Sequence, residues 1–188
     1  MSLLSKWKDE GILASETYDA LQKFIDLLVQ WNSRINLTGL GSREEIEEVL
    51  VGESVFAGSA FPLSRKRVLD FGSGSGIPGL IWAILDPSIK LTSVEIRAKK
   101  ISFQKEIVRR LGLSAEVIQG KFPEVVRDRK FDVIATRAVR FDEKLLEKSA
   151  LLLEPGGSLL RFSSSWSDAG IWKSIPLSEK STLLVLSR

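Results

Sequence analysis

Three glycines and one acidic residue between positions 67 and 79 form the stretch of this sequence best suited to chemistry. Residues 68–71 are an apolar run of strand length, and Gly72, Gly74 and Gly76 follow directly. Pro78 and Gly79 then open a helical segment that extends to residue 85. Glycine allows a tight turn and a close approach of backbone amides to a ligand. The spacing therefore predicts a ligand-binding loop between a strand and a helix.

The glycine pattern alone leaves the ligand open. Residues 74–79 satisfy the dinucleotide fingerprint Gly-x-Gly-x-x-Gly, and Glu95 lies about twenty residues further on, where an acid binds a ribose. Asp70 completes the pattern Asp-x-Gly-x-Gly-x-Gly, which resembles motif I of class I S-adenosylmethionine-dependent methyltransferases. This acid favours S-adenosylmethionine over a nicotinamide dinucleotide. A purely structural turn is the remaining alternative.

The residue types that are absent restrict the chemistry. The 188 residues include no cysteine and no histidine, which removes thiolate nucleophiles, disulfides and the commonest general base and metal ligand. Hydrophobic residues make up 44% and charged residues 27%, as in an ordinary soluble domain. No apolar run has the length of a membrane span, and no signal peptide heads the sequence. We therefore expect a cytoplasmic protein that holds no metal.

Residues 1–64 predict a helical extension that packs on the rest of the chain. Five apolar residues follow the spacing of one helix face: Leu21, Phe24, Ile25, Leu28 and Val29. Ser15 is the candidate N-cap of this helix, and residues 42–45 (SREE) have the pattern of a capping box. A helix carrying Ile46, Val49 and Leu50 is expected after the box.

From residue 65 to residue 188 strands alternate with helices. Strands are predicted at 68–71, 91–95, 115–118, 131–135 and 158–162, and helices at 99–111 and 141–153. Gly112 is the natural end of the first of these helices. Residues 171–175 and 182–186 predict a closing antiparallel hairpin. The expected fold is α/β, a doubly wound, mostly parallel, seven-stranded sheet of the Rossmann-like class I methyltransferase type.

In such a sheet ligands bind beyond the carboxyl ends of the strands. Glu95 ends the second strand, where a carboxylate accepts hydrogen bonds from both ribose hydroxyls of a nucleoside cofactor. Gly120, Lys121 and Phe122 follow the third strand and are expected near the adenine. Ordinary core packing of Phe122 is an equal alternative.

Basic residues gather on one stretch of the sequence. Residues 97–110 contain six basic residues and one acidic residue, whereas residues 43–53 contain five acidic residues and one basic residue. This asymmetry suits a protein that presents one face to phosphate, although a solvated helix face is the plain alternative. Arg97, Lys99 and Lys100 lie nearest the predicted ligand, and Arg137 and Arg140 belong to the rim of the pocket.

Four motifs together resemble the RsmG family, formerly called GidB. They are WNSRINLT at 31–38, the loop ending Gly-x-Pro-Gly at 76–79, Lys99-Lys100 with Phe103, and Thr-Arg-Ala at 136–138. The family comprises the guanine-N7 methyltransferases of bacterial small-subunit ribosomal RNA. The resemblance covers the chain from the second helix to the fifth strand. It implies that Asn32, Arg34 and Asn36 lie at the active face, whereas local chemistry alone favours a helix end and a turn.

The sequence departs from the family pattern at several positions. Leu50 and Glu53 stand where the family usually has histidine and aspartate, and Glu95 stands where aspartate is common. Arg161, Phe162 and Ser163 replace a Lys-Gly pair after the fifth strand. These differences leave the expected fold and cofactor unchanged but weaken the transfer of the RNA target. A methyltransferase with another substrate, a nucleotide-dependent oxidoreductase and a non-catalytic RNA-binding relative therefore remain alternatives.

The missing residue types agree with methylation at guanine N7. This nitrogen has a lone pair and no proton, so direct in-line transfer needs positioning and no general base. The expected catalytic residues are Arg137 and Asn36. The residues expected to bind S-adenosylmethionine are Asp70, Gly72, Ser73, Gly74, Gly76, Pro78, Glu95, Ile96, Lys121, Phe122 and Arg137. The residues expected to bind RNA are Asn32, Arg34, Arg97, Lys99, Lys100 and Arg140. The expected partner is 16S ribosomal RNA or the 30S subunit, bound by a monomer.

Overall fold

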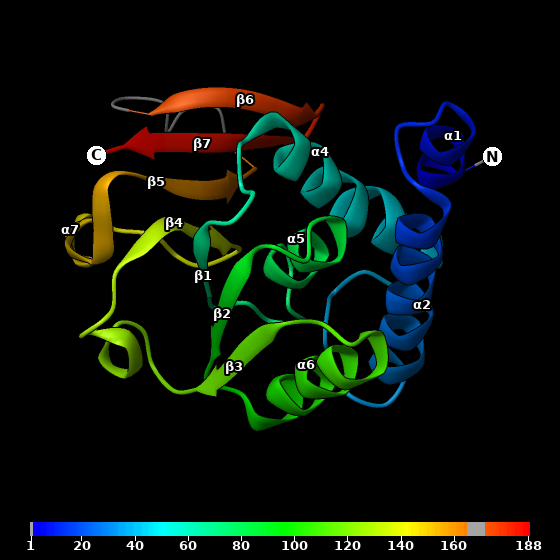
Figure 1. Ribbon diagram of the computed structural model, residues 1–188. Helices are drawn as coiled ribbons and strands as arrows, with labels where there is room; N and C mark the ends of the chain where they lie inside the picture. The colour runs from blue at the N-terminus through cyan, green and yellow to red at the C-terminus, as the bar shows by residue number, and fades with distance from the viewer. Residues whose placement is uncertain (1, 165–171) are drawn as a thin grey trace.

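The computed structural model describes residues 2–164 and 172–188. Within them lies a seven-stranded sheet with the strand order β3-β2-β1-β4-β5-β7-β6, which Figure 1 shows from bottom to top. The strands are β1 (Arg67–Phe71), β2 (Lys90–Glu95), β3 (Ala115–Gln119), β4 (Phe131–Arg137), β5 (Leu153–Ser163), β6 (Lys173–Ser178) and β7 (Ser181–Ser187).

The pairing of the strands confirms the predicted α/β sheet. β1 pairs in parallel with β2 and β4, and the parallel set continues to β3 and β5. β7 then runs antiparallel between β5 and β6, so the predicted closing hairpin is present. Its first strand was expected to start at residue 171, which lies outside the described residues. The described part of the strand begins at Lys173.

The start of the fifth strand was predicted five residues too late. β5 begins at Leu153, directly after helix α7, and not after the Pro-Gly-Gly sequence at 155–157. Leu153 is buried and pairs with Phe131, whereas Ser158 pairs with Val133. The Pro-Gly-Gly sequence therefore forms an irregularity inside the strand, because burial of Leu153 holds the chain in the sheet on both sides of it.

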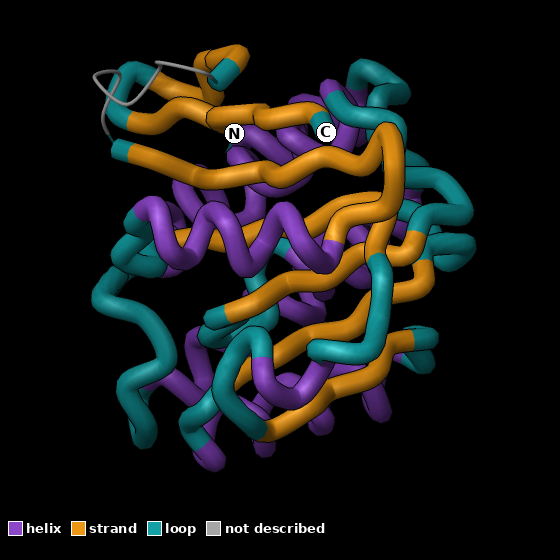
Figure 2. Tube along the Cα trace, turned by 90° about the vertical axis from the view of Figure 1, so that its left-hand side faces the viewer, coloured by secondary structure: helices purple, strands orange, loops and turns teal. Residues whose placement is uncertain are grey.

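Helices cover both faces of the sheet. They are α1 (Leu3–Asp9), α2 (Ser15–Asn32), α3 (Arg43–Glu45), the π-helical turn η1 (Ile46–Gly52), α4 (Glu53–Ala60), α5 (Gly79–Leu85), α6 (Ala98–Leu111), the 3-10 turn η2 (Glu124–Val126) and α7 (Glu143–Leu152). In Figure 1, α5 and α6 lie against the right-hand face with α2 and α4 outside them, and α7 lies on the left. Figure 2 shows the sheet from the side of α7.

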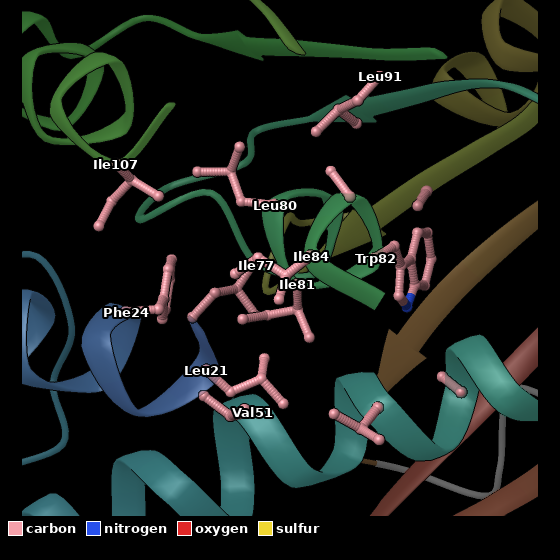
Figure 3. Packing of buried hydrophobic residues seen from close by; sticks show 14 of the residues in the cluster. Leu21, Phe24, Val51, Ile77, Leu80, Ile81, Trp82, Ile84, Leu91 and Ile107 are labelled. Carbon is pink, nitrogen blue, oxygen red and sulfur yellow. The ribbon is translucent and has the colours of Figure 1, made fainter. Parts of the chain in front are cut away.

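The larger core lies between the sheet and the helices of the first 60 residues. Residues 79–84 of α5 are all buried, so this short helix is apolar on every side. Figure 3 shows Ile81 of α5 facing Leu21 of α2, whereas Trp82 lies on the side of α5 towards α4, where its Nε1 donates to the Ser54 carbonyl. Burial of each such side chain contributes about 1.5–3 kcal/mol. The helices of residues 3–60 therefore pack on the sheet largely through α5, with further contacts of α2 to α6 and of α4 to β6.

The structure corrects three details of the predicted helices. Ser15 is the first residue of α2 and not its cap; Ala14 stands at the cap position and makes no side-chain hydrogen bond there. Val29 is 37% exposed, and Leu27 is buried instead. The capping box is confirmed, since Ser42 and Glu45 bond to each other's backbone amides.

The helix after the capping box differs from an ordinary α-helix. Of the three apolar residues expected on its inner face, only Ile46 is buried, and Val49 is 38% exposed. The cause is the π-helical turn, whose wider spacing rotates the residues away from a 3.6-residue stripe. None of the helices in the described ranges is long and apolar enough to cross a membrane.

Candidate active site

The glycine loop leaves the end of β1 and curls over the end of β2. The amides of Gly72 and Ser73 donate to the Val94 carbonyl at 2.9 and 3.3 Å. Gly72 and Gly74 have φ angles of +65° and +59°, in the left-handed region that favours glycine. A Cβ atom on Gly72 would lie 2.5 Å from Cγ2 of Val139. Both conformation and space therefore require glycine at position 72.

Asp70 supports the loop from beneath. Its side chain is fully buried, and Oδ2 accepts a hydrogen bond of 2.8 Å from the amide of Gly79 at the start of α5. Oδ1 has no hydrogen-bond partner among the described residues. Burial raises the pKa of Asp70 to about 7, against the opposing effect of the Gly79 amide. Ser73, Gly76 and Pro78 are also buried, so the structure places them where they shape the loop.

Gln104 of α6 ties the loop to β2, and sequence analysis did not identify it. Its Nε2 donates to Ser73 Oγ and to the Gly74 carbonyl, each at 2.8 Å. Its Oε1 accepts a hydrogen bond of 2.6 Å from Ser93 Oγ. The side chain is completely buried. In the sequence, Gln104 is marked only by being polar at a position where the inner face of this helix is otherwise apolar.

The carboxylate of Glu95 closes the loop onto the end of β2. Oε2 accepts from the Gly74 amide at 2.8 Å, and Oε1 accepts from the amides of Ile96 and Arg97 at 2.8 and 3.0 Å. The residue is 6% exposed. Because a carboxylate has about four lone-pair sites and these amides take three, one site remains on Oε2 to accept from a ligand.

A hollow of about 470 Å³, called here the first hollow, lies at the ends of β1, β2 and β3. Gly72, Glu95, Ile96, Gly120 and Phe122 line it, and their contact with a cofactor stays a prediction. The ring of Phe122 is stacked on Phe71 with centroids 4.0 Å apart, so Phe122 both packs and lines the hollow. Lys121 is exposed and lies outside this wall.

A second hollow of about 600 Å³ adjoins the first. Its wall combines residues from four parts of the chain: Val49 and Glu53, Arg137 to Val139, Arg161 to Ser164, and Ser178 to Ser181. Ala138 and Val139 also line the first hollow, so the two spaces adjoin at these residues. Ala138 has a φ angle of +56°, an unfavourable conformation for a residue with a Cβ atom. Such strain is typical of functional sites.

Arg137 lies in the wall of the second hollow and is not among the residues that line the first. Its Nη2 donates to Glu53 Oε2 at 2.7 Å and to the Val49 carbonyl at 3.0 Å. The guanidinium lies 5.1 Å from the ring centroid of Phe162. Burial lowers the pKa of Arg137, while the charge of Glu53 raises it. A guanidinium stays protonated in proteins, so the buried cation is stabilised by Glu53.

The predicted RNA-binding residues are not equivalent. Arg97, Lys99 and Arg140 are exposed, as phosphate contacts require. Lys100 is half-buried and lines the first hollow, where burial lowers its pKa and the charge of Glu95 opposes that effect. The structure thus places Lys100 at the cofactor side, and its contact with RNA stays a prediction.

The turn after α2 uses Asn32 for its own structure. Oδ1 accepts from the amides of Leu37 and Thr38 at 2.8 and 3.0 Å, and Nδ2 donates to the Leu40 carbonyl at 3.2 Å. This is the structural role that local chemistry favours. Arg34 and Asn36 are exposed and lie outside the walls of both hollows. Their predicted roles at RNA and in catalysis remain untested.

Comparisons with known proteins agree on one family and one fold. Residues 17–174 match the model of the GidB family, rRNA small subunit methyltransferase G. The ribosomal RNA small subunit methyltransferase G of Mycobacterium leprae is 36% identical over 148 residues, which cover 74% of this chain and 58% of that protein. This chain thus spans less than two thirds of the length of that relative.

Two solved structures illustrate the fold. The ribosomal protein L11 methylase of Lactobacillus delbrueckii superposes with a TM-score of 0.60 at 16% identity, over 72% of this chain and 76% of that one. A SAM-dependent methyltransferase of Thiobacillus denitrificans, in complex with S-adenosyl-L-homocysteine, has a TM-score of 0.52 at 25% identity, over 68% and 51%. Together with the family match over most of its length, they show that this chain has the class I methyltransferase fold and belongs to the family of rRNA small subunit methyltransferase G.

Proposed function

We propose that the protein transfers a methyl group from S-adenosylmethionine to N7 of a guanine in 16S ribosomal RNA. The observation that carries this proposal is the pair of adjoining hollows in a chain of this family. Ala138 and Val139 line both hollows, so a cofactor in one and a base in the other would meet at this wall. We further propose that the protein acts in the cytoplasm, as a monomer, on the 30S subunit.

The first hollow fits S-adenosylmethionine. Glu95 brings a carboxylate that suits ribose hydroxyls, and Phe122 brings a ring that suits adenine. The missing side chain of Gly72 keeps the wall clear beside Val139. When bound, S-adenosylmethionine supplies a methyl group carried on a positively charged sulfur. We assign contacts with it to Gly72, Glu95, Ile96 and Phe122, and support of the loop to Asp70, Ser73, Gly74, Gly76 and Pro78.

The acceptor chemistry suits a chain without histidine or cysteine. Guanine N7 has a lone pair and carries no proton, so no residue has to remove one. The protein's task is then to orient the base and to keep N7 free of hydrogen-bond donors. Exposed Arg97, Lys99 and Arg140 are suited to hold RNA phosphates while the base leaves its stack.

Incubation with labelled S-adenosylmethionine and small ribosomal subunits from a strain that lacks the modification tests the proposal. The RNA is then digested, and 7-methylguanosine is located by mass spectrometry. Label at one guanine is the expected result. Binding of S-adenosylhomocysteine without any transfer to RNA would contradict the proposed substrate.

Two glycines with the same backbone conformation provide a matched control. Gly74 in the loop has a φ of +59°, and Gly112 at the end of α6 has a φ of +63° with open space around its Cα. Alanine at either position costs similar backbone strain. Gly74→Ala should abolish the rise in melting temperature produced by S-adenosylhomocysteine, whereas Gly112→Ala should retain it. Equal effects would contradict the assignment of the loop.

A further inference from the structure

Arg137 is held from three sides by groups that are distant in sequence. Glu53 of α4 and the Val49 carbonyl of η1 accept from its Nη2, and the ring of Phe162 lies beneath the guanidinium. Glu53 is fixed in turn, because its Oε1 accepts from the hydroxyls of Ser178, at 2.9 Å, and Ser181. The guanidinium therefore has little freedom to rotate or withdraw from the second hollow.

This arrangement leaves the two N–H groups of Arg137 Nη1 unused. Nη2 has two N–H groups, and both are taken by Glu53 and Val49. Nη1 is buried and has no acceptor in the described part of the chain. A buried donor without a partner is costly, especially on a charged group, and native proteins seldom keep one without a reason. An acceptor atom brought by a ligand of the second hollow would remove that cost.

We propose that the second hollow receives the target guanine and that Arg137 Nη1 donates a hydrogen bond to guanine O6. This inference rests on the proposed function and names the atom that selects the base. Guanine presents O6 as an acceptor beside N7, whereas adenine presents an amino group at the same position. A donor fixed at this place therefore accepts guanine and rejects adenine.

The pairing with Glu53 also explains how an arginine can read guanine without blocking the reaction. The common contact of arginine with guanine is bidentate and places one donor on O6 and a second on N7. Here Nη2 already donates twice within the protein, so Nη1 alone is offered to the base. The lone pair of N7 stays free to accept the methyl group. Glu53 is thus a positioning residue, which acts on the base through Arg137.

Base analogues at the target position test this assignment in the wild-type protein. Hypoxanthine keeps O6 and N7, and 2,6-diaminopurine keeps N7 but carries an amino group in place of O6. We expect RNA with hypoxanthine at the guanine found by the labelling experiment to be methylated within a few-fold of the natural RNA. Diaminopurine should be methylated about 10- to 100-fold more slowly, the usual discrimination of one specific base contact.

Substitution of the arginine should remove the discrimination. Arg137→Lys keeps a positive charge but lacks the geometry that reaches Glu53 and O6 together. We expect the ratio of guanine to diaminopurine rates to fall towards one in this variant, with cofactor affinity retained. Arg110→Lys is the matched control, since Arg110 is an exposed arginine paired with Glu106. Its rate ratio should equal that of the wild type.

The outcomes separate this inference from the proposed function. Each variant is first checked for the rise in melting temperature with S-adenosylhomocysteine. This rise shows that the variant is folded and that its first hollow binds the ligand. If the wild type methylates diaminopurine as fast as guanine, or rejects hypoxanthine, the inference is overturned while the methyltransferase proposal stands. Retained discrimination in a folded Arg137→Lys variant would also overturn it. If no RNA is methylated at all, the proposed function fails and this inference fails with it.

Discussion

The two hollows meet at Ala138 and Val139 but are built in opposite ways. The first depends on main-chain geometry at the ends of neighbouring strands, where glycines and backbone amides bonded to Glu95 form the wall. The second depends on side chains from distant segments, since Glu53 contacts Arg137 across 84 residues and Ser181 across 128 residues. The cofactor side is thus a local structure, and the acceptor side is a product of the whole fold.

This difference predicts different kinds of sensitivity. Loss of one side chain in the second hollow leaves charged or polar partners buried and unpaired, which lowers the stability of the whole protein. In the first hollow, we expect a loss of similar size only from substitutions that strain the backbone of the loop or remove the groups that hold the loop. The four predictions below test this contrast, from the largest expected effect to the smallest.

The largest effect is expected from loss of Glu53. In Glu53→Ala the buried guanidinium of Arg137 loses its counter-charge, which should lower the free energy of unfolding by about 3–5 kcal/mol. Urea denaturation measures the change. Glu106→Ala removes a carboxylate that is 22% exposed and pairs with the exposed Arg109 and Arg110, and it should change the free energy of unfolding by at most about 1 kcal/mol. Similar losses in both variants would show that burial of the pair is unimportant.

A change at Gly72 should mainly affect the first hollow. An alanine there brings its Cβ atom 2.5 Å from Val139 Cγ2 at a φ of +65°. The overlap costs about 1–3 kcal/mol and the backbone conformation about 1–2 kcal/mol. Affinity for S-adenosylhomocysteine, measured by calorimetry, should therefore fall by about a hundredfold.

A double variant divides this effect between its two causes. Val139→Ala removes the overlapping methyl group, so Gly72→Ala combined with Val139→Ala should recover part of the affinity. The loss of affinity that remains in the double variant measures the cost of the backbone conformation at position 72. Strictly additive losses would mean that Gly72 and Val139 do not contact each other as the structure shows.

Gln104 tests whether a side chain beneath the loop matters as much as the glycines within it. Gln104→Leu removes the partner of Ser93 Oγ and of the Gly74 carbonyl, and leaves Ser73 Oγ with the Val94 carbonyl alone. Stability should fall by about 1–3 kcal/mol, with a parallel loss of cofactor affinity. Thermal unfolding with and without S-adenosylhomocysteine measures both. Unchanged affinity would assign Gln104 to packing alone.

The smallest effect, taken over one pH unit, is a pH dependence from Asp70. Burial raises its pKa from 3.8 to about 7, so between these values the folded protein binds this proton more tightly than the unfolded chain. The free energy of unfolding should therefore fall as the pH rises through this window, by at most about 1.4 kcal/mol per pH unit. Asp70→Asn cannot ionise and keeps an oxygen for the Gly79 amide. The free energy of unfolding of this variant, measured by urea denaturation, should lack this dependence on pH. An identical slope of the free energy against pH in both proteins would contradict the prediction.

Sequence patterns predicted the glycine loop and the acid of the first hollow because these parts are close in the chain, but they did not predict that Ala138, Val139 and Leu145 line it as well. The strand, the glycines and the helix of residues 67–85 follow one another, and Glu95 ends the next strand. The strand ends then converge because parallel strands align their carboxyl ends. The same local patterns could not show that Leu153 joins β5, since its pairing with buried Phe131 is a tertiary interaction.

Sequence patterns did not predict the contacts that build the second hollow. Glu53 was noted only as a departure from the family, and Arg137 was expected as a catalytic and cofactor-binding residue at the rim. No sequence spacing relates the two residues. The π-helical turn that brings the Val49 carbonyl to Arg137 has no recognisable sequence signal. Gln104 was missed for the same reason, because its partners Ser73, Gly74 and Ser93 come together only in the folded chain.

The order of segments along the chain has a consequence for how the protein is made. All residues that line the first hollow have been synthesised once residue 145 has been added. The second hollow still lacks the turn between β6 and β7, whose serines hold Glu53. A newly made chain therefore acquires the wall for its cofactor before the wall for its base, and release of a prematurely terminated product would yield a protein without the second hollow.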